Sequence, residues 1–324
     1  MQFDSVGVVM QIQRLAFQNP QTVAAYYREQ SLSYGELGRR SFCLSEALKA
    51  QGVEAGAVLG VCIRPGFDIL IALIAIFRCR AIYLPLDPDH PDTHIQMIVA
   101  NAAPRLILTQ RAHSGVTRAF HSLILDEFQY DSSEKIAEID EMMVPRPADG
   151  SASAYLMYTS GTTGAPKGVL VANDNLHHYL AAAQQALQFR PGDVFCNVAR
   201  YTFSISLFDL LLPLCVGAAV KLLDREDVLD FPKLIQHLAR ATTIHAGPSL
   251  LATLFRYIRN LDSGSIKSEY KAILAHLRHV STGGDIVLPA IMEGMKTNFP
   301  QAELFVIYGS TEISCMGTYF PIPR

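Results

Sequence analysis

The chain has no block of lysine or arginine, and only 18% of its 324 residues are charged, with a formal net charge of −3. Binding to the phosphate backbone of a nucleic acid needs concentrated positive charge. The composition therefore excludes a nucleic-acid partner and favours a small molecule. Half of the residues are hydrophobic, which provides for a large buried core and excludes a disordered chain.

The sequence also has few cysteines and no long apolar run. Its six cysteines are scattered without a CxxC pair, so they indicate reduced core residues rather than a zinc site. No basic region precedes an apolar run at the start, as a signal peptide requires. The longest uncharged apolar stretch, residues 69–77, is too short to cross a bilayer. We therefore expect a cytoplasmic protein without a membrane partner.

Short β-rich runs alternate with longer helical patterns along the chain, which predicts an α/β fold with mostly parallel sheets. One helix start is clear, because Ser33 and Glu36 can form a capping box and Gly52 can end the helix. The predicted buried strands are Val58–Ile63, Arg105–Thr109, Ala154–Thr159, Ala218–Leu223, Thr243–Ala246 and Glu303–Ile307.

The segment Asp126–Gly150 is charged, contains serine and proline, and has little periodicity, so we expect a surface connection. It would separate a first α/β subdomain, residues 1–150, from a second, residues 151–324.

The segment Tyr158–Gly168 is the most informative part of the chain. It places four serine or threonine hydroxyls, three glycines and Lys167 directly after an apolar strand. Glycines let backbone N–H groups converge on an anion, hydroxyls donate further hydrogen bonds, and the lysine adds a positive charge. The pattern differs from a Walker loop, because Pro166 precedes the lysine and Gly168 follows it. It nevertheless predicts a phosphate-binding loop.

Two further polar segments follow predicted strands. They are Ser281–Asp285, with the sequence STGGD, and Tyr308–Glu312, with the sequence YGSTE. Taken alone, the first can be a simple turn, and the acid of the second can be solvated or can cap a helix. Ligands of open parallel sheets sit beyond the carboxyl ends of the strands. We therefore expect these two segments and the phosphate loop to meet at one ligand.

Together, these segments resemble the AMP-forming adenylating enzymes, which include acyl-CoA synthetases, luciferases and the adenylation domains of nonribosomal peptide synthetases. The resemblance is strongest to the adenylation domains. Leu32–Leu37 is similar to their first conserved block, Ala81–Pro91 to their second, and Phe203–Ala218 to the block that opens their substrate pocket. It implies two stacked αβαβα subdomains with mostly parallel sheets, which form a truncated large domain of the acyl-adenylate-forming fold.

The resemblance also implies a function. A carboxylate would attack the α-phosphate of ATP, giving an acyl-adenylate and pyrophosphate, with Mg²⁺ as the second cofactor. The acyl group would then pass to the phosphopantetheine thiol of a downstream carrier protein. Lys167, Thr311 and Glu312 would be the catalytic residues, with Glu312 as the metal ligand, because a hard cation prefers carboxylate oxygen.

The same resemblance assigns the nucleotide site. Tyr308 would stack on adenine, and Gly283 and Gly284 would let the backbone approach it closely. The residues implied to bind the nucleotide are Thr159, Ser160, Gly161, Thr162, Thr163, Gly164, Lys167, Gly283, Gly284, Asp285, Tyr308, Gly309, Ser310 and Thr311.

The substrate pocket departs from the family pattern. Adenylation domains that select α-amino acids carry FDxS at the start of the pocket helix, and the aspartate pairs with the substrate ammonium. Here Ser204 replaces that aspartate, a loss that costs an ammonium on the order of 2–5 kcal/mol. We therefore predict an acid without a free α-amino group, such as a keto, hydroxy, aryl or short acyl acid. Carried over by position, the pocket residues are Phe203, Ser204, Ile205, Phe208, His245, Ser281, Gly283, Ile307, Cys315 and Met316.

Two residues near this pocket keep alternative interpretations. His245 can contact the substrate, or it can be a satisfied core residue on an apolar strand. Asp209 can replace the lost aspartate, although an acid on the outer face of that helix is the more common case.

The sequence ends at Arg324, shortly after Glu312. Family members continue into a third subdomain, with an aspartate for the ribose hydroxyls, and a small C-terminal domain with a reactive lysine. Neither has a counterpart here, so we expect the first two lobes of an adenylating enzyme. The alternatives are a degenerate ATP-binding module without catalysis and a relative of the acyl-CoA synthetases.

Overall fold

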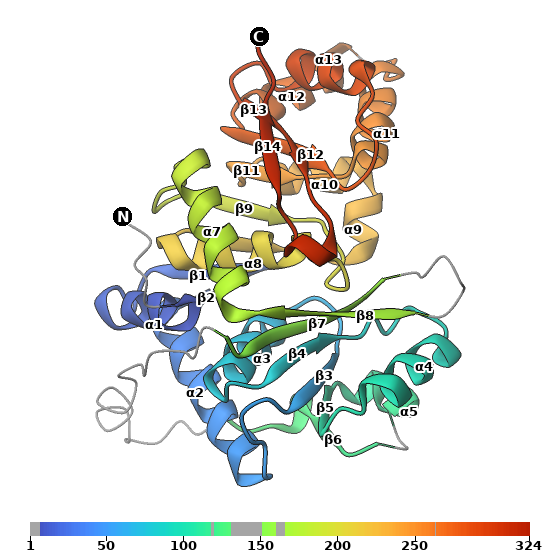
Figure 1. Ribbon diagram of the computed structural model, residues 1–324. Helices are drawn as coiled ribbons and strands as arrows, with labels where there is room; N and C mark the ends of the chain where they lie inside the picture. The colour runs from blue at the N-terminus through green and yellow to red at the C-terminus, as the bar shows by residue number, and fades with distance from the viewer. Residues whose placement is uncertain (1–6, 118–119, 131–150, 160–165, 263) are drawn as a thin grey trace.

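The computed structural model describes residues 7–117, 120–130, 151–159, 166–262 and 264–324. Figure 1 shows two sheets stacked with helices between them and on both outer faces. The helices are α1 (Val8–Gln18), α2 (Tyr34–Ala50), α3 (Phe67–Arg78), α4 (Asp92–Ala102), α5 (Ser114–Thr117), α7 (Asn173–Leu187), α8 (Ile205–Val216), α9 (Arg225–Leu229), α10 (Phe231–Leu238), α11 (Pro248–Arg259), α12 (Gly264–Ala275) and α13 (Pro289–Asn298).

One sheet has six described strands in the order β6-β5-β3-β4-β7-β8. Its strands are β3 (Val58–Cys62), β4 (Ile82–Pro85), β5 (Leu106–Thr109), β6 (Ser122–Ile124), β7 (Ser153–Thr159) and β8 (Lys167–Ala172). All neighbouring pairs are parallel except the β7–β8 hairpin. Parallel strands buried on both faces carry continuous apolar runs, which is why the sequence predicted most of them.

The other sheet has eight described strands in the order β14-β13-β12-β11-β9-β10-β1-β2. Its strands are β1 (Val23–Tyr27), β2 (Gln30–Ser33), β9 (Val194–Asn197), β10 (Ala219–Leu222), β11 (Thr243–His245), β12 (His279–Gly283), β13 (Glu303–Tyr308) and β14 (Thr318–Pro321). The outer pairs β1–β2 and β13–β14 are antiparallel, and the pairs between them are parallel.

The largest apolar core lies between the two sheets and includes residues of α1, α2, α3, α7 and α8. A second core packs α10, α11 and α13 on the outer face of the eight-stranded sheet. A third packs α4 on the outer face of the six-stranded sheet. The layers therefore run helix, sheet, helix, sheet, helix, so the two sheets share one αβαβα arrangement. The predicted α/β fold with mostly parallel sheets is confirmed.

The capping box at the start of α2 is also confirmed. The Glu36 amide donates to Ser33 Oγ at 3.2 Å, and the Ser33 amide donates to Glu36 Oε2 at 3.1 Å. These bonds satisfy two donors that a helix start leaves free. At the other end, α2 stops at Ala50, and Gly52 takes the left-handed φ of +77° that ends the turn.

The expected division at residue 150 does not follow the sheets. Strands β7 and β8, from the second predicted subdomain, complete the six-stranded sheet, and β1 and β2, from the first, extend the eight-stranded one. Most of the expected surface connection, residues 131–150, lies outside the described residues.

Candidate functional site

The predicted phosphate loop connects two paired antiparallel strands. Thr159 ends β7, Lys167 begins β8, and the two residues are partners in the hairpin register. The Lys167 side chain is exposed to solvent. Of the predicted loop, Ser160, Gly161, Thr162, Thr163 and Gly164 lie outside the described residues. Thr159 and Lys167 therefore fix where the loop begins and ends.

The predicted metal ligand lies in a short 3₁₀ turn, η3 (Thr311–Ile313), directly after β13. Glu312 is exposed, and hydrogen bonds from its own backbone amide and from Ser310 lower the pKa of its carboxyl group. An ionised, accessible carboxylate fits a Mg²⁺ ligand. Tyr308, predicted to stack on adenine, ends β13 with 69% of its surface exposed.

The turn η3 packs against β8, the strand that Lys167 begins (Figure 1). Strands β12 and β13 are parallel neighbours, so Ser281–Asp285 and Tyr308–Glu312 follow the same edge of the eight-stranded sheet. The phosphate hairpin belongs to the other sheet, yet it lies on the side where η3 lies. The strand that begins at Lys167 and the turn that carries Glu312 thus come from different sheets into contact.

The glycines of this region have packing reasons to be glycine. A Cβ atom on Gly283 would lie 2.0 Å from the Ile307 carbonyl oxygen, and one on Gly309 would lie 1.6 Å from the Cys315 carbonyl oxygen. Gly284 has space around it but a left-handed φ of +80°. At Gly283, the atom that leaves no room for a side chain therefore belongs to the neighbouring strand β13.

The last residue of the STGGD segment, Asp285, was predicted to bind the nucleotide. Its carboxylate is exposed and accepts the Ile286 amide at 2.7 Å. One carboxylate oxygen is therefore used within the turn, and nucleotide binding by Asp285 stays a prediction.

Two of the predicted pocket residues form a buried pair. His245 ends β11 and Ser281 lies in the adjacent strand β12, and His245 Nδ1 is 2.9 Å from Ser281 Oγ. Burial lowers the pKa of His245 to about 4, so the imidazole is neutral at physiological pH. The histidine is therefore a hydrogen-bonded core residue whose Ser281 partner is also a predicted pocket residue.

Ser204 and Cys315 also lie close together. Ser204 precedes α8, and burial raises the pKa of the Cys315 thiol to about 12, a rise that the nearby Ser204 side chain opposes. Ile307 is buried on β13, and Ile205 and Met316 are half-buried against the core between the sheets.

Phe203 and Phe208 take opposite environments. Phe203 is 60% exposed, whereas Phe208 is 1% exposed and packs edge to face with Phe189 and Phe195. A role in substrate binding remains a prediction for both.

The expectation that Asp209 lies on the outer face of its helix is wrong. Helix α8 is enclosed between the sheets, and Asp209 is only 1% exposed. Asn197, at the end of β9, donates its side-chain amide to Asp209 Oδ2 at 3.2 Å. Burial raises the pKa of this carboxyl group well above its usual value, and the hydrogen bond from Asn197 opposes that rise.

A cleft of about 610 Å³ between the two sheets was not predicted from the sequence. Its walls are mostly apolar, but three arginines and two aspartates lie among them. The lining residues are Val61, Ile63, Arg64, Pro65, Leu86, Asp87, Pro88, Asp89, Asn197, Val198, Ala199, Arg200, Tyr201, Leu223, Arg225 and Val228. Most of them follow the carboxyl ends of β3, β4, β9 and β10, where ligands of parallel sheets bind. The sequence feature that could have indicated this cleft is an arginine directly after the predicted strand Val58–Ile63.

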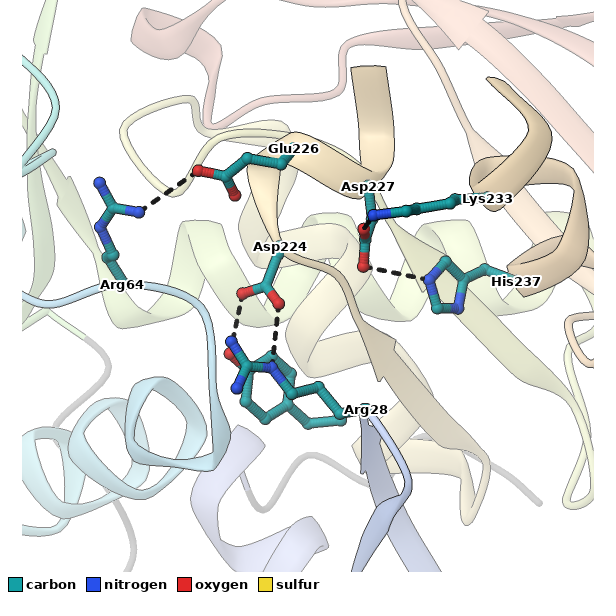
Figure 2. Close-up of polar contacts among 8 residues, drawn as sticks. Arg28, Arg64, Asp224, Glu226, Asp227, Lys233 and His237 are labelled. Atoms are coloured by element: carbon teal, nitrogen blue, oxygen red, sulfur yellow. Dashed lines mark hydrogen bonds and ion pairs between the residues drawn. The ribbon is translucent and has the colours of Figure 1, made fainter. Parts of the chain in front are cut away.

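Ion pairs cross this cleft from one sheet to the other. Arg64, after β3, contacts Asp89 at 2.7 Å and Glu226 of α9 at 3.4 Å, and Figure 2 shows the second contact. Arg200, after β9, contacts Asp87 at 3.2 Å. Arg225 differs, because its Nε atom is buried without a hydrogen-bond partner among the described residues. One guanidinium of the cleft therefore has an unused donor.

A second group of charges surrounds the start of α9. Asp224 binds Arg28 at 3.1 Å and the Tyr27 hydroxyl at 2.8 Å, and Asp227 binds Lys233 and His237 (Figure 2). These contacts join β1 and α10 to the α9 segment. They fix the α9 side of the cleft, although exposed ion pairs stabilise little by themselves.

The chain matches one protein family over nearly its whole length. Residues 12–324 match the family model described as AMP-binding enzyme. The chain therefore belongs to the AMP-binding enzyme family.

Individual relatives are synthases of very different lengths. The chain is 26% identical over 316 residues to tyrocidine synthase 3 of Brevibacillus parabrevis, an alignment that covers 97% of this chain and 5% of that relative. It is 27% identical over 316 residues to zwittermicin A synthase ZmaJ of Bacillus cereus, covering 94% of this chain and 57% of that relative. The chain thus spans only part of the proteins that it matches.

Solved structures show the same fold. A four-domain nonribosomal peptide synthetase bound to AMP and glycine matches with a TM-score of 0.81 and 25% identity, over 97% of this chain and 22% of that one. The AMPPNP-bound form of the nonribosomal peptide synthetase FmoA3 matches with a TM-score of 0.83 and 22% identity, over 98% of this chain and 33% of that one.

Two further results concern the described residues alone. Among them, no helix has the length and apolar character that crossing a membrane requires. Within the same residues, no three histidine, cysteine, aspartate or glutamate side chains gather closely enough to hold a metal ion.

Proposed function

We propose that this chain is the nucleotide- and acid-binding core of an enzyme that activates a carboxylic acid as an acyl-adenylate within a nonribosomal-peptide-synthetase-like polypeptide. The observation that carries the proposal is the packing of η3, with Glu312, against the strand that Lys167 begins. Membership of the AMP-binding family supports it. ATP and Mg²⁺ are the proposed cofactors.

In the proposed reaction, a carboxylate oxygen of the substrate attacks the α-phosphorus of ATP. A new P–O bond forms, the bond to the β-phosphate oxygen breaks, and pyrophosphate leaves. Bound Mg²⁺ would neutralise charge on the phosphates. Lys167 offers a cation to the leaving pyrophosphate, Glu312 offers a ligand for the metal, and Thr311 offers a hydroxyl to the α-phosphate. Such a substitution depends on positioning and charge neutralisation, which these residue types supply.

We further propose a substrate without a free α-amino group. Ser204 carries no charge that could pair with an ammonium, so a charge-assisted hydrogen bond is lost there. The other predicted pocket groups are neutral or apolar, because His245 is uncharged. A keto, hydroxy, aryl or short acyl acid therefore meets no unpaired charge, whereas an ammonium would lose its hydration without gaining a partner.

The proposed acceptor is a carrier-protein phosphopantetheine thiol, and the cleft between the sheets supports it. The cleft combines apolar walls with the Nε donor of Arg225, which is buried and has no hydrogen-bond partner among the described residues. A phosphopantetheine arm has a phosphate for the guanidinium and, beside its amide groups, methyl and methylene groups for the apolar walls. A cytoplasmic location is proposed with it, supported by six cysteines that form no disulfide, five of which are buried.

ATP–pyrophosphate exchange with a panel of amino, keto and hydroxy acids tests the proposal. We expect exchange with one of the acids that lack an α-amino group. A strong preference for an ordinary L-amino acid would contradict the substrate class. Calorimetric binding of ATP·Mg²⁺ without exchange for any acid would favour the alternative, a non-catalytic ATP-binding module.

A further inference from the structure

Two buried donors in the cleft between the sheets have no hydrogen-bond partner among the described residues. They are Arg225 Nε and Tyr201 Oη, and both residues line the cleft. Buried polar groups are nearly always paired, and an unpaired one is completed by a water or a ligand. The proposed phosphate would occupy Arg225, but it leaves the Tyr201 hydroxyl without a function.

Asn197 adds a neutral amide to the same cleft. It ends β9, lines the cleft and is 3% exposed. Its side-chain amide donates to Asp209 Oδ2 at 3.2 Å, and Asp209 is enclosed on α8. An amide side chain offers two N–H donors and an oxygen with two lone pairs. The bond to Asp209 therefore orients Asn197 and uses only one of these donors.

Neutral and charged groups occupy different depths of the cleft. Asn197 is still part of the eight-stranded sheet, where it pairs in register with Leu222 of β10. Arg225 begins α9, beyond the end of that sheet, and Arg64 pairs there with Glu226 at 3.4 Å (Figure 2). The Arg64 side chain is 45% exposed, which places these charges at the mouth of the cleft. A ligand with an anionic head would therefore keep that head outermost and extend a neutral body toward Asn197.

We propose that Tyr201 and Asn197 form an amide subsite, which makes the cleft select a thiol arm with amide groups over a hydrocarbon arm. An amide presents a carbonyl acceptor and an N–H donor. The Tyr201 hydroxyl can donate to the carbonyl, and the Asn197 side-chain oxygen can accept from the N–H. Asp209 acts through Asn197 and is a positioning residue. This inference rests on the proposed function and adds specificity-determining residues to its acceptor site.

A hydrocarbon arm fits the walls of the cleft but not its polar groups. It would fill the apolar surface and cover the Asn197 amide without bonding it, which costs the desolvation of that amide. The Tyr201 hydroxyl would stay unpaired. A site built to hydrogen-bond a polar group discriminates strongly against an analogue that lacks the group. The subsite therefore predicts a difference in affinity that apolar contact alone cannot produce.

Two phosphate esters, one with amide groups and one without, test the subsite. Phosphopantetheine carries amides, octyl phosphate carries none, and each is titrated by calorimetry into the chain. We expect the wild type to bind phosphopantetheine roughly 10-fold more tightly. Tyr201→Phe should weaken phosphopantetheine binding roughly 3- to 10-fold and leave octyl phosphate binding unchanged. Because this variant removes only an unpaired hydroxyl, its urea unfolding midpoint should match that of the wild type.

Asp209 supplies a second test of the same subsite. Asp209→Leu removes the acceptor that orients Asn197, so it should weaken phosphopantetheine binding and leave octyl phosphate binding unchanged. Asp209→Asn keeps an oxygen that can accept the Asn197 amide, so it should bind both probes as the wild type does. Arg225→Ala should weaken the binding of both probes, because both carry the phosphate.

Tyr130→Phe is the matched control, because Tyr130 also has a buried hydroxyl without a described partner but packs on Phe128 and does not line the cleft. It should bind both probes like the wild type. Equal affinity of the wild type for the two probes, or an equal loss for both in Tyr201→Phe, would overturn this inference alone. Failure of both probes to bind would overturn the cleft as the acceptor site, and this inference with it. Pyrophosphate exchange tests the adenylation step separately.

Discussion

His245 Nδ1 lies 2.9 Å from Ser281 Oγ across two adjacent buried strands, and the imidazole is uncharged. The pKa of this histidine falls from 6.5 to about 4 on folding. A depressed folded pKa contributes stability that is fully present above pH 6.5 and is lost as the pH falls toward 4. Complete loss of this contribution lowers the free energy of unfolding by about 3 kcal/mol.

We therefore expect His245→Gln to have a smaller loss of unfolding free energy between pH 7 and pH 4.5 than the wild type. Urea unfolding at several pH values measures it. His178→Gln, at an exposed position of α7, is the control and should keep the wild-type slope. Equal slopes for the two variants would show that His245 is protonated as readily in the folded protein as in the unfolded one.

Lys167→Ala should weaken pyrophosphate exchange. Removing one charge-assisted hydrogen bond to a phosphate costs about 1.5–3 kcal/mol, or roughly 10- to 150-fold in kcat/KM. Lys271→Ala, an exposed lysine of α12, is the matched control and should exchange like the wild type. Unchanged exchange in Lys167→Ala would remove this lysine from the phosphate site.

Ser204→Asp should shift the substrate preference toward α-amino acids. A carboxylate at this position restores a partner for the ammonium, and the change in relative kcat/KM should be roughly 30-fold or more. Exchange with matched keto and amino acids measures the ratio. Ser206→Asp is not a suitable control, because the Ser206 hydroxyl already donates to the Phe203 carbonyl at 2.7 Å. Ser204→Asn, which keeps the polarity without the charge, is the suitable control, and an equal shift in both variants would argue against a role for the charge.

Gly283→Ala should destabilise the protein by about 1–3 kcal/mol, because its Cβ atom would lie 2.0 Å from the Ile307 carbonyl oxygen. Gly115→Ala is the control, since Gly115 lies within helix α5 and has no atom within 4 Å of an added Cβ. Denaturant unfolding should show no loss for that variant. Equal stability of the two variants would mean that β12 and β13 separate easily.

Arg225→Ala should slow transfer to a carrier thiol and leave pyrophosphate exchange unchanged. The guanidinium lines the cleft between the sheets, and no residue of β8, the strand that Lys167 begins, lines that cleft. Loading of a phosphopantetheinylated carrier protein, measured in the complete enzyme, reports the transfer to the thiol. Arg259→Ala, in α11, is the control. Loss of exchange in Arg225→Ala would place this arginine with the nucleotide.

The sequence predicted the fold class because the central strands are apolar on both faces. All six predicted strands are present within one or two residues, and the Ser33 capping box is formed. The strands that it missed lie mostly at sheet edges or are short. Strand β14, for example, is exposed along its whole length and has no buried pattern to detect.

The site was harder to predict, because tertiary packing decides it. Helix α8 is apolar nearly throughout, so its sequence could not show which face meets a pocket and which meets a sheet. Asp209 was therefore assigned to the wrong environment. The cleft could not be predicted either, since it brings together residues up to 167 positions apart, from Val61 to Val228.

The exchange of strands between the two sheets also affects the order in which this chain can fold during synthesis. Strands β1 and β2 are made first, but the neighbour to which β1 pairs, β10, ends at Leu222. The early hairpin therefore waits for nearly two hundred further residues, and closing so long a loop is slow. A ribosome that releases the chain before Leu222 would leave an unpaired β edge, and truncated products should aggregate rather than form a separate lobe.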